Sequence, residues 1–129
     1  MSFVTKQLAT FPDVTAPDGS EVRVLCSTSR GSLAHFTLPP QAVSKAMAHH
    51  SVEEFWYFVS GRGQMWRRLH DREEIVDVGP GVAITIPIGT HFQFRSISHE
   101  PLAAVGTTMP PWPGEGEAFA VDGIWEPTV

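Results

Sequence analysis

Two pairs of neighbouring residues in the middle of the sequence carry side chains that could do chemistry. His49-His50 is followed, after Ser51 and Val52, by Glu53-Glu54. Imidazole transfers protons near neutral pH, and both imidazole and carboxylate bind transition metals. A buried carboxylate needs such a partner, because burial of an unpaired charge is costly. We therefore expect His49 and Glu54 to act together, either as an acid/base pair or as metal ligands.

Other catalytic patterns are absent from the sequence. Cys26 is the one cysteine, which excludes an intrachain disulfide and a cluster of thiolate ligands, and we interpret it as part of the core. No serine nucleophile elbow is found. The glycines of Gly61-Arg62-Gly63 do not form a phosphate loop, because no helix is expected after them.

The composition excludes several classes of protein. The 129 residues include 11 glycines and 11 prolines and carry a formal net charge of -5, with only nine lysines and arginines. This balance argues against a nucleic-acid partner. No apolar run approaches the roughly 20 residues that span a bilayer, and the first residues lack the apolar segment of a signal peptide. We therefore expect a cytoplasmic protein without a membrane partner.

Short strands must position His49 and Glu54. Each predicted strand is bounded by glycine, proline or polar turn residues, and this close spacing is typical of an all-β sandwich or barrel. Residues 41–50 are predicted to be extended rather than helical. The other predicted strands cover residues 21–26, 32–38, 54–59, 64–68, 75–78, 82–86, 91–95 and 102–107.

The stretch from His49 to Gly61 resembles the first motif of the cupin family. That motif has two histidines separated by one residue, then a glutamate, then a glycine. Glu54 and Gly61 keep the spacing between the last two positions, and His49 matches the second histidine. The first histidine would fall on Met47, which is a departure from the motif.

A second stretch, from Gly81 to Phe92, resembles the second motif of the same family. Gly81, Pro87 and Gly89 match it, whereas its histidine position falls on Phe92, with His91 one place early. The resemblance covers about residues 31–107. It implies a small antiparallel β-barrel, or jelly roll, that is often a homodimer and holds one ligand pocket.

The resemblance also implies a metal site. Cupins hold Fe, Mn, Ni, Cu or Zn with three histidines and a glutamate, so His49 and Glu54 would be ligands here, and His91 the third if a bulge after Gly89 turns it inward. His50 is an alternative if the backbone before Glu53 is irregular. Phe92 beside His49 argues against a metal, so one divalent transition metal and a metal-free site are both retained. His35 could contribute to such a site from another strand.

Strand alternation places Glu54, Trp56 and Phe58 on one face of their strand. Met47 shares a face with His49 in the same way. We expect four side chains, beside the acid/base pair, to contact a substrate: Met47, Trp56, Phe58 and Phe92.

The expected organisation is a single domain over residues 1–129, with a core barrel at 20–108 and arms at 1–19 and 109–129. Apolar residues in the arms favour docking, either on the same barrel or on the second subunit of a homodimer. We predict an enzyme that acts on a small organic molecule in the barrel mouth, as a metal-dependent dioxygenase or isomerase. The alternative is a metal-free cupin that binds a small ligand or sugar, with His49 and Glu54 as an acid/base pair or without catalysis.

Overall fold

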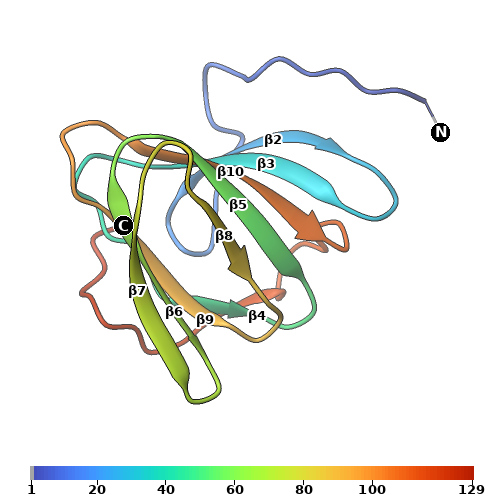
Figure 1. Ribbon diagram of the computed structural model, residues 1–129. Helices are drawn as coiled ribbons and strands as arrows, with labels where there is room; N and C mark the ends of the chain where they lie inside the picture. Colours follow the sequence, from blue (N-terminus) through green and yellow to red (C-terminus); the bar gives the residue numbers. More distant parts are fainter. Residues whose placement is uncertain (1) are drawn as a thin grey trace.

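The computed structural model describes residues 2–129 and consists of two antiparallel β-sheets that face each other (Figure 1). Within these residues there is no helix, and so none that is long and apolar enough to cross a bilayer. The predicted all-β, antiparallel fold class is confirmed. The six-stranded sheet contains, in spatial order, β1 (Val14–Thr15), β2 (Glu21–Ser27), β3 (Ser32–Leu38), β10 (Leu102–Met109), β5 (Glu53–Ser60) and β8 (Ala83–Ile86). The five-stranded sheet contains β11 (Ala118–Ala120), β4 (Met47–His49), β9 (His91–Ser96), β6 (Gly63–Leu69) and β7 (Arg72–Val78).

The core lies between the two sheets, and strand alternation supplies it with side chains. On β5, Glu54, Trp56 and Phe58 are buried while the residues between them are exposed, as the sequence pattern predicts. From the opposite sheet, β9 contributes Phe92 and Phe94, which are also buried. The inner face of β5 therefore carries one carboxylate at the edge of an otherwise apolar core.

Glycines shape the turns that keep these strands in register. Gly61, between β5 and β6, has a φ of 77°, and Gly81, before β8, has a φ of 91°. Residues that carry a side chain rarely adopt this left-handed backbone conformation, so glycine is the residue that fits. Gly61 is further constrained because a Cβ there would collide with the backbone of Pro101 and Leu102.

Residues 41–50 differ from the predicted strand, because regular pairing is limited to β4. Gln41 has a left-handed φ of 61°. Val43 forms an isolated antiparallel bridge with Arg95 of β9, but the backbone N–H of Lys45 then donates to the carbonyl of Asp18, 2.8 Å away. The irregular approach to β4 consequently brings the β1–β2 turn next to the chain that carries His49.

The segment that follows β10 docks on its own five-stranded sheet. Its strand β11 pairs with β4. The buried amide of Gln93 on β9 donates to the carbonyl of Trp125 and accepts from the backbone N–H groups of Ile124 and Trp125. The guanidinium of Arg95 lies 4.3 Å from the ring centroid of Trp125. Within this single chain, the arm thus packs against the sheet that contains β4 and β9.

Candidate functional site

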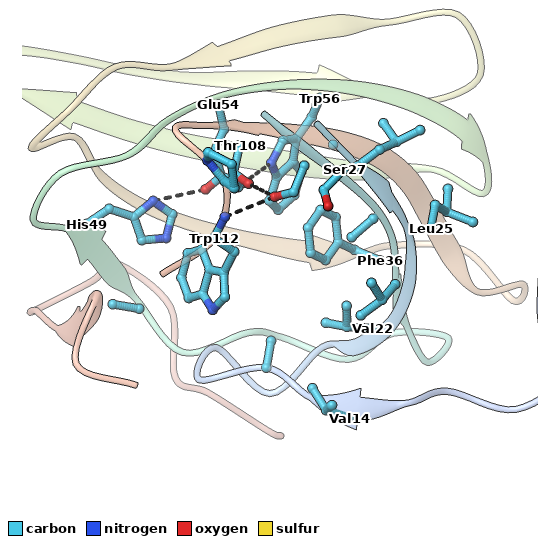
Figure 2. Close-up of a pocket in the computed structure, with 18 of the residues that line it drawn as sticks. Val14, Val22, Leu25, Ser27, Phe36, His49, Glu54, Trp56, Thr108 and Trp112 are labelled. Atoms are coloured by element: carbon cyan, nitrogen blue, oxygen red, sulfur yellow. Dashed lines mark hydrogen bonds and ion pairs between the residues drawn. The ribbon is translucent and has the colours of Figure 1, made fainter. Parts of the chain in front are cut away.

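A cavity of about 620 Å³ is enclosed by β2, β3, β4 and β5 together with the segments before β1 and after β10 (Figure 2). Most of its lining is apolar, which excludes water from much of the wall and favours an apolar ligand. The apolar side chains that line it include Val22, Val24, Leu33, Phe36, Trp56 and Trp112.

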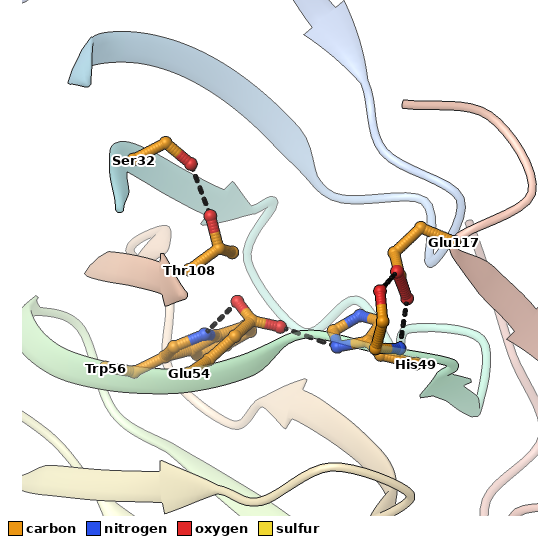
Figure 3. Close-up of polar contacts among 7 residues, drawn as sticks. Ser32, His49, Glu54, Trp56, Thr108 and Glu117 are labelled. Carbon is orange, nitrogen blue, oxygen red and sulfur yellow. Dashed lines mark hydrogen bonds and ion pairs between the residues drawn. The ribbon is translucent and has the colours of Figure 1, made fainter. Parts of the chain in front are cut away.

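A buried polar cluster of His49, Glu54 and Trp56 forms part of this mostly apolar wall (Figures 2 and 3). Nδ1 of His49 lies 2.9 Å from Oε2 of Glu54, within ion-pairing distance, and Nε1 of Trp56 donates a 2.9 Å hydrogen bond to Oε1. His49 and Glu54 are only 6% and 4% exposed. Both carboxylate oxygens of Glu54 are therefore engaged by other side chains, which holds the group in one orientation.

Aromatic rings fix the orientation of the His49 imidazole. Phe92 and Trp112 each pack edge-on against it, with ring centroids 5.3 Å away. Met47 lies two residues before His49 on the same face of β4, and it is paired with Phe92 across the β4–β9 ladder. Figure 2 shows the second ring nitrogen of His49 turned away from Glu54, toward Trp112. No hydrogen bond to that nitrogen is formed within residues 2–129, and His49 lines the cavity.

The Trp56 indole is positioned by a tight aromatic contact. Its ring stacks on Phe36 with centroids 4.9 Å apart and an interplanar angle of 20°. Both rings lie over Gly106 of β10, where an added Cβ would stand 2.6 Å from Phe36 and 2.9 Å from Trp56. The absence of a side chain at Gly106 thus allows Trp56 to reach Glu54.

Replacing Gly106 with alanine is expected to lower the free energy of unfolding by about 1–3 kcal/mol, the usual cost of forcing extra volume into a packed site. The methyl group must displace Phe36 or Trp56, so the tryptophan fluorescence should also change. Urea unfolding checks the first effect. As a control, Gly114→Ala adds its methyl group where no atom lies within 4 Å, although its left-handed backbone carries a conformational cost. A Gly106 variant as stable as wild type with unchanged fluorescence would contradict this packing.

Asp18 is a cavity residue that sequence reasoning missed. It lies in the turn between β1 and β2, is 7% exposed, and lines the same cavity as His49 and Glu54. Burial raises the pKa of the Asp18 carboxyl, hydrogen bonds from Ser20 oppose this, and the charge of Glu54 raises it further. A Pro-Asp-Gly sequence is an ordinary turn signal, so nothing in the sequence distinguished Asp18 from a surface turn residue.

Glu117 was also missed, and it supports the site from outside. Its carboxylate accepts hydrogen bonds from the backbone N–H and the hydroxyl of Ser51, just after His49 and His50 (Figure 3). Burial acts to raise the pKa of Glu117, but the Ser51 hydrogen bonds outweigh it, so the pKa is lowered. The contact joins the segment before β11 to the loop that leads into β5.

The remaining expected site residues do not line the cavity. Phe58 lies deeper in the core, where its ring is 6.1 Å from that of Trp56. His91 precedes Phe92 on β9, and its side chain does not reach the cavity. His50 is exposed and stacks on Phe119 of β11. Cys26 is half-buried and lines the cavity, so its interpretation as core was wrong.

The donor set does not fit the metal centre that the sequence resemblance implies. Within residues 2–129, no three His, Cys, Asp or Glu side chains are grouped so that they could share a metal ion. Of the expected ligands, only His49 and Glu54 lie together, and the Nδ1 atom of His49 already faces the carboxylate. Met47 and Phe92 occupy the motif positions of the other two imidazoles, and neither supplies a nitrogen.

Comparison with known proteins agrees with the architecture. A family model described as "Cupin domain" matches residues 34–107, more than half of the chain. No curated protein sequence matches the chain. Among solved structures, the protein BH2720 from Bacillus halodurans superposes with a TM-score of 0.65 and 21% identity, over 77% of this chain and 76% of that one.

Two larger proteins contain a similar unit. Oxalate decarboxylase from Bacillus subtilis gives a TM-score of 0.71 at 18% identity, over 87% of this chain and 30% of its own. The capsular polysaccharide assembling protein CapF from Staphylococcus aureus gives 0.67 at 16% identity, over 84% of this chain and 33% of its own. The chain thus spans about a third of each of these proteins, and at such identities the likeness concerns the fold alone.

Proposed function

The chain belongs to the cupin domain family, and from this premise we propose that it is an acid/base enzyme that moves a proton on a small, largely apolar carbonyl compound. One observation carries the proposal. The buried His49–Glu54 pair, with its carboxylate held by Trp56, lines a cavity whose wall is mostly apolar. The proposal extends the isomerase-type reading of the sequence in its metal-free form.

The arrangement assigns a separate role to each group. The free ring nitrogen of His49 takes a proton from the carbon next to the substrate carbonyl, and the electron pair of that C–H bond moves toward the carbonyl oxygen. Glu54 stabilises the imidazolium through Nδ1 and keeps the ring in place, as a carboxylate does for other catalytic histidines. Return of the proton to the same or a neighbouring carbon completes an epimerisation or isomerisation without any oxidant.

The cavity wall supports the substrate class. Phe36, Trp56 and Trp112 offer flat aromatic surface, and aliphatic residues of β2 and β3 continue it. Such a wall binds an aromatic or aliphatic body better than a sugar, whose hydroxyl groups would lose hydrogen bonds to water. The substrate we propose therefore has an apolar body and a polar end that reaches His49.

The metal-dependent dioxygenase or isomerase reading is less well supported by the residues present. A relative of the same fold, Bacillus subtilis oxalate decarboxylase, is described as having Mn(II) centres. Here the described residues offer a pair of donors rather than a group of three or more. His49 and Glu54 are better explained as partners of each other.

Deuterium exchange tests the proposal. The protein is incubated in D2O at neutral pD with 2-tetralone, 1-indanone or 4-methyl-2-pentanone, and loss of the α-proton signals is followed by NMR. We expect at least one ketone to exchange faster than in buffer with the same concentration of His49→Gln protein. Binding of these ketones without faster exchange would instead favour the alternative, a ligand-binding module without catalysis.

A homodimer and a cytoplasmic location belong to the same proposal. The segment before β1 leads away from the two sheets (Figure 1), and its Phe3 and Phe11 side chains are 105% and 79% exposed. Exposed apolar side chains gathered on one segment offer a surface for a protein–protein contact, and we place the subunit contact there. Cys26 has no disulfide partner, which suits a reducing compartment.

Light scattering should give the mass of two chains at micromolar concentration. Replacing Phe3 and Phe11 with serine is expected to shift the mass toward one chain, because it removes the apolar surface proposed to be buried between subunits. Ile97→Ser, at an exposed position outside this segment, should leave the dimer intact. A wild-type mass of one chain would contradict the proposal.

A further inference from the structure

The β1–β2 turn places a carboxyl group in the cavity that the proposed chemistry does not yet use. Asp18 is buried and lines the cavity together with His49 and Glu54, although it lies 31 residues before His49 in the chain. The turn is held firmly: the N–H of Gly19 donates to Ala16, and the Asp18 carbonyl accepts from Lys45. A fixed turn presents the carboxyl to the cavity in one position.

The hydrogen bonds of Asp18 leave one oxygen available. Oδ1 accepts both from the backbone N–H of Ser20, at 2.8 Å, and from its hydroxyl, at 2.6 Å. No donor among residues 2–129 bonds Oδ2. A buried carboxyl with a free oxygen on a cavity wall is poised to interact with whatever fills the cavity.

The electrostatic surroundings favour the protonated form of this carboxyl. Burial is the main cause that raises the pKa of Asp18, and the Glu54 carboxylate adds to it, while His49 acts in the opposite sense. Two carboxyl groups that share one apolar cavity cannot both ionise cheaply. A protonated carboxyl is a hydrogen-bond donor, and Oδ2 of Asp18 is the oxygen that the Ser20 hydrogen bonds leave free to carry its proton toward a substrate oxygen.

We propose that Asp18 is the second catalytic group of this site, donating its carboxyl proton to the carbonyl oxygen of the substrate while His49 removes the proton from the neighbouring carbon. This inference rests on the proposed function and names the group that stabilises its intermediate. As the C–H bond breaks, its electrons form a C=C bond and the carbonyl π electrons move to oxygen. That oxygen takes the proton from Asp18, giving an enol and a carboxylate, and both transfers reverse when His49 returns its proton to carbon.

A purely structural role for Asp18 predicts a different outcome. The Oδ1 bonds to Ser20 are those of an ordinary Asx turn, which asparagine forms equally well. Asp18→Asn therefore keeps the turn and the hydrogen-bonding capacity but removes the ionisable proton. Asp18→Ala removes the turn hydrogen bonds, the hydrogen-bonding capacity toward the cavity and the ionisable proton. Comparing the two variants separates catalysis from folding.

The test uses 2-tetralone exchange in the wild type and its variants. We expect Asp18→Ala to lower the rate by about 100-fold, the cost of losing a donor to a developing oxyanion. Asp18→Asn should recover part of this loss, and it should lack the decrease in rate that the wild type shows as the pH rises and Asp18 ionises. Asp71→Ala, a change at an exposed aspartate in the turn between β6 and β7, away from the cavity, should leave the rate unchanged.

The pH dependence of stability gives an independent readout that needs no substrate. Native Asp18 holds its proton more tightly than the unfolded chain, whose carboxyl has a pKa near 3.8. Wild-type stability is therefore lost as the pH rises from this value through the native pKa. The urea midpoint of Asp18→Asn minus that of the wild type should increase over the same range. The other charged groups near Asp18 are Glu54, His49 and Lys45, and all are common to both proteins.

The outcomes separate this inference from the proposed function. Exchange that depends on His49 but is identical in the wild type and Asp18→Asn at every pH would overturn the role of Asp18 alone. A midpoint difference that does not change with pH would also count against it. Absence of His49-dependent exchange in the wild type would overturn the proposed function itself.

Discussion

Replacing His49 with glutamine is expected to lower the rate of ketone deuterium exchange by about 10²–10⁴-fold, the usual contribution of a positioned acid/base group. Glutamine is similar in length to histidine and polar, so the cavity keeps its volume. It cannot accept a proton near neutral pH, and Glu54 is left without an imidazole to stabilise. The measurement is the initial rate of α-proton loss by NMR, at protein concentrations verified to be folded.

A matched histidine variant controls for this change. His99 is exposed and its nearest polar neighbour is the side chain of Gln41, at 3.5 Å. His99→Gln removes an imidazole far from the cavity and should leave the rate at the wild-type value. Equal rates for the two variants would mean that His49 does not handle the proton.

Replacing Glu54 with alanine is expected to reduce the free energy of unfolding by about 3–5 kcal/mol, the range seen when one partner of a buried pair is removed. The change leaves two buried donors, Nδ1 of His49 and Nε1 of Trp56, facing a void. Desolvated donors without acceptors are costly, and the lost volume adds to that cost. Urea unfolding, monitored by circular dichroism, measures the difference.

Two variants bracket this effect. Glu53→Ala changes the neighbouring residue, whose side chain is exposed on the other face of β5, and should alter stability by no more than about 0.5 kcal/mol. Glu54→Gln keeps an acceptor for Trp56 and nearly the same volume, so it should cost less than Glu54→Ala. If Glu53→Ala and Glu54→Ala cost the same, the buried cluster does not contribute as described.

Much of the fold could be predicted because period-two burial and glycine turns are local properties of the sequence. The strand from Glu53 to Ser60 shows this, since strand alternation put Glu54 and Trp56 on one face and the family spacing from Glu54 to Gly61 indicated that this face points inward. Residues 41–50 could not be predicted in the same way. Their backbone hydrogen bonds go to distant segments, including Asp18, and local pattern says nothing about such partners.

The site could be predicted only where the sequence indicated which residues of a strand face inward. Because side chains alternate along a strand, Glu54 and Trp56 were expected on the same face of one strand. The short loop between β4 and β5 then keeps His49 close to Glu54. Asp18 and Trp112 could not be found, because they reach the cavity through a turn and a tail whose placement depends on tertiary packing. Their sequence contexts are those of ordinary turns and proline-rich loops.

The ligand role suggested for His91 depended on a local irregularity. One extra residue in a strand reverses the side to which the following residues point, and such a bulge after Gly89 would have turned His91 inward. The structure instead pairs β9 regularly with β6, with Phe92 opposite Arg67 and His91 opposite Arg68. Phe92 consequently takes the inward position, and its ring packs against His49.

The central claim is that the His49–Glu54 pair moves the proton without help from a metal. It is tested most directly by measuring 2-tetralone exchange before and after the protein is dialysed against a strong chelator, with bound metal checked by mass spectrometry. The account predicts that the metal-stripped wild type keeps its full exchange rate and that His49→Gln loses it in either state. Loss of exchange on chelation, with recovery on adding Mn(II) or Fe(II), would contradict the account.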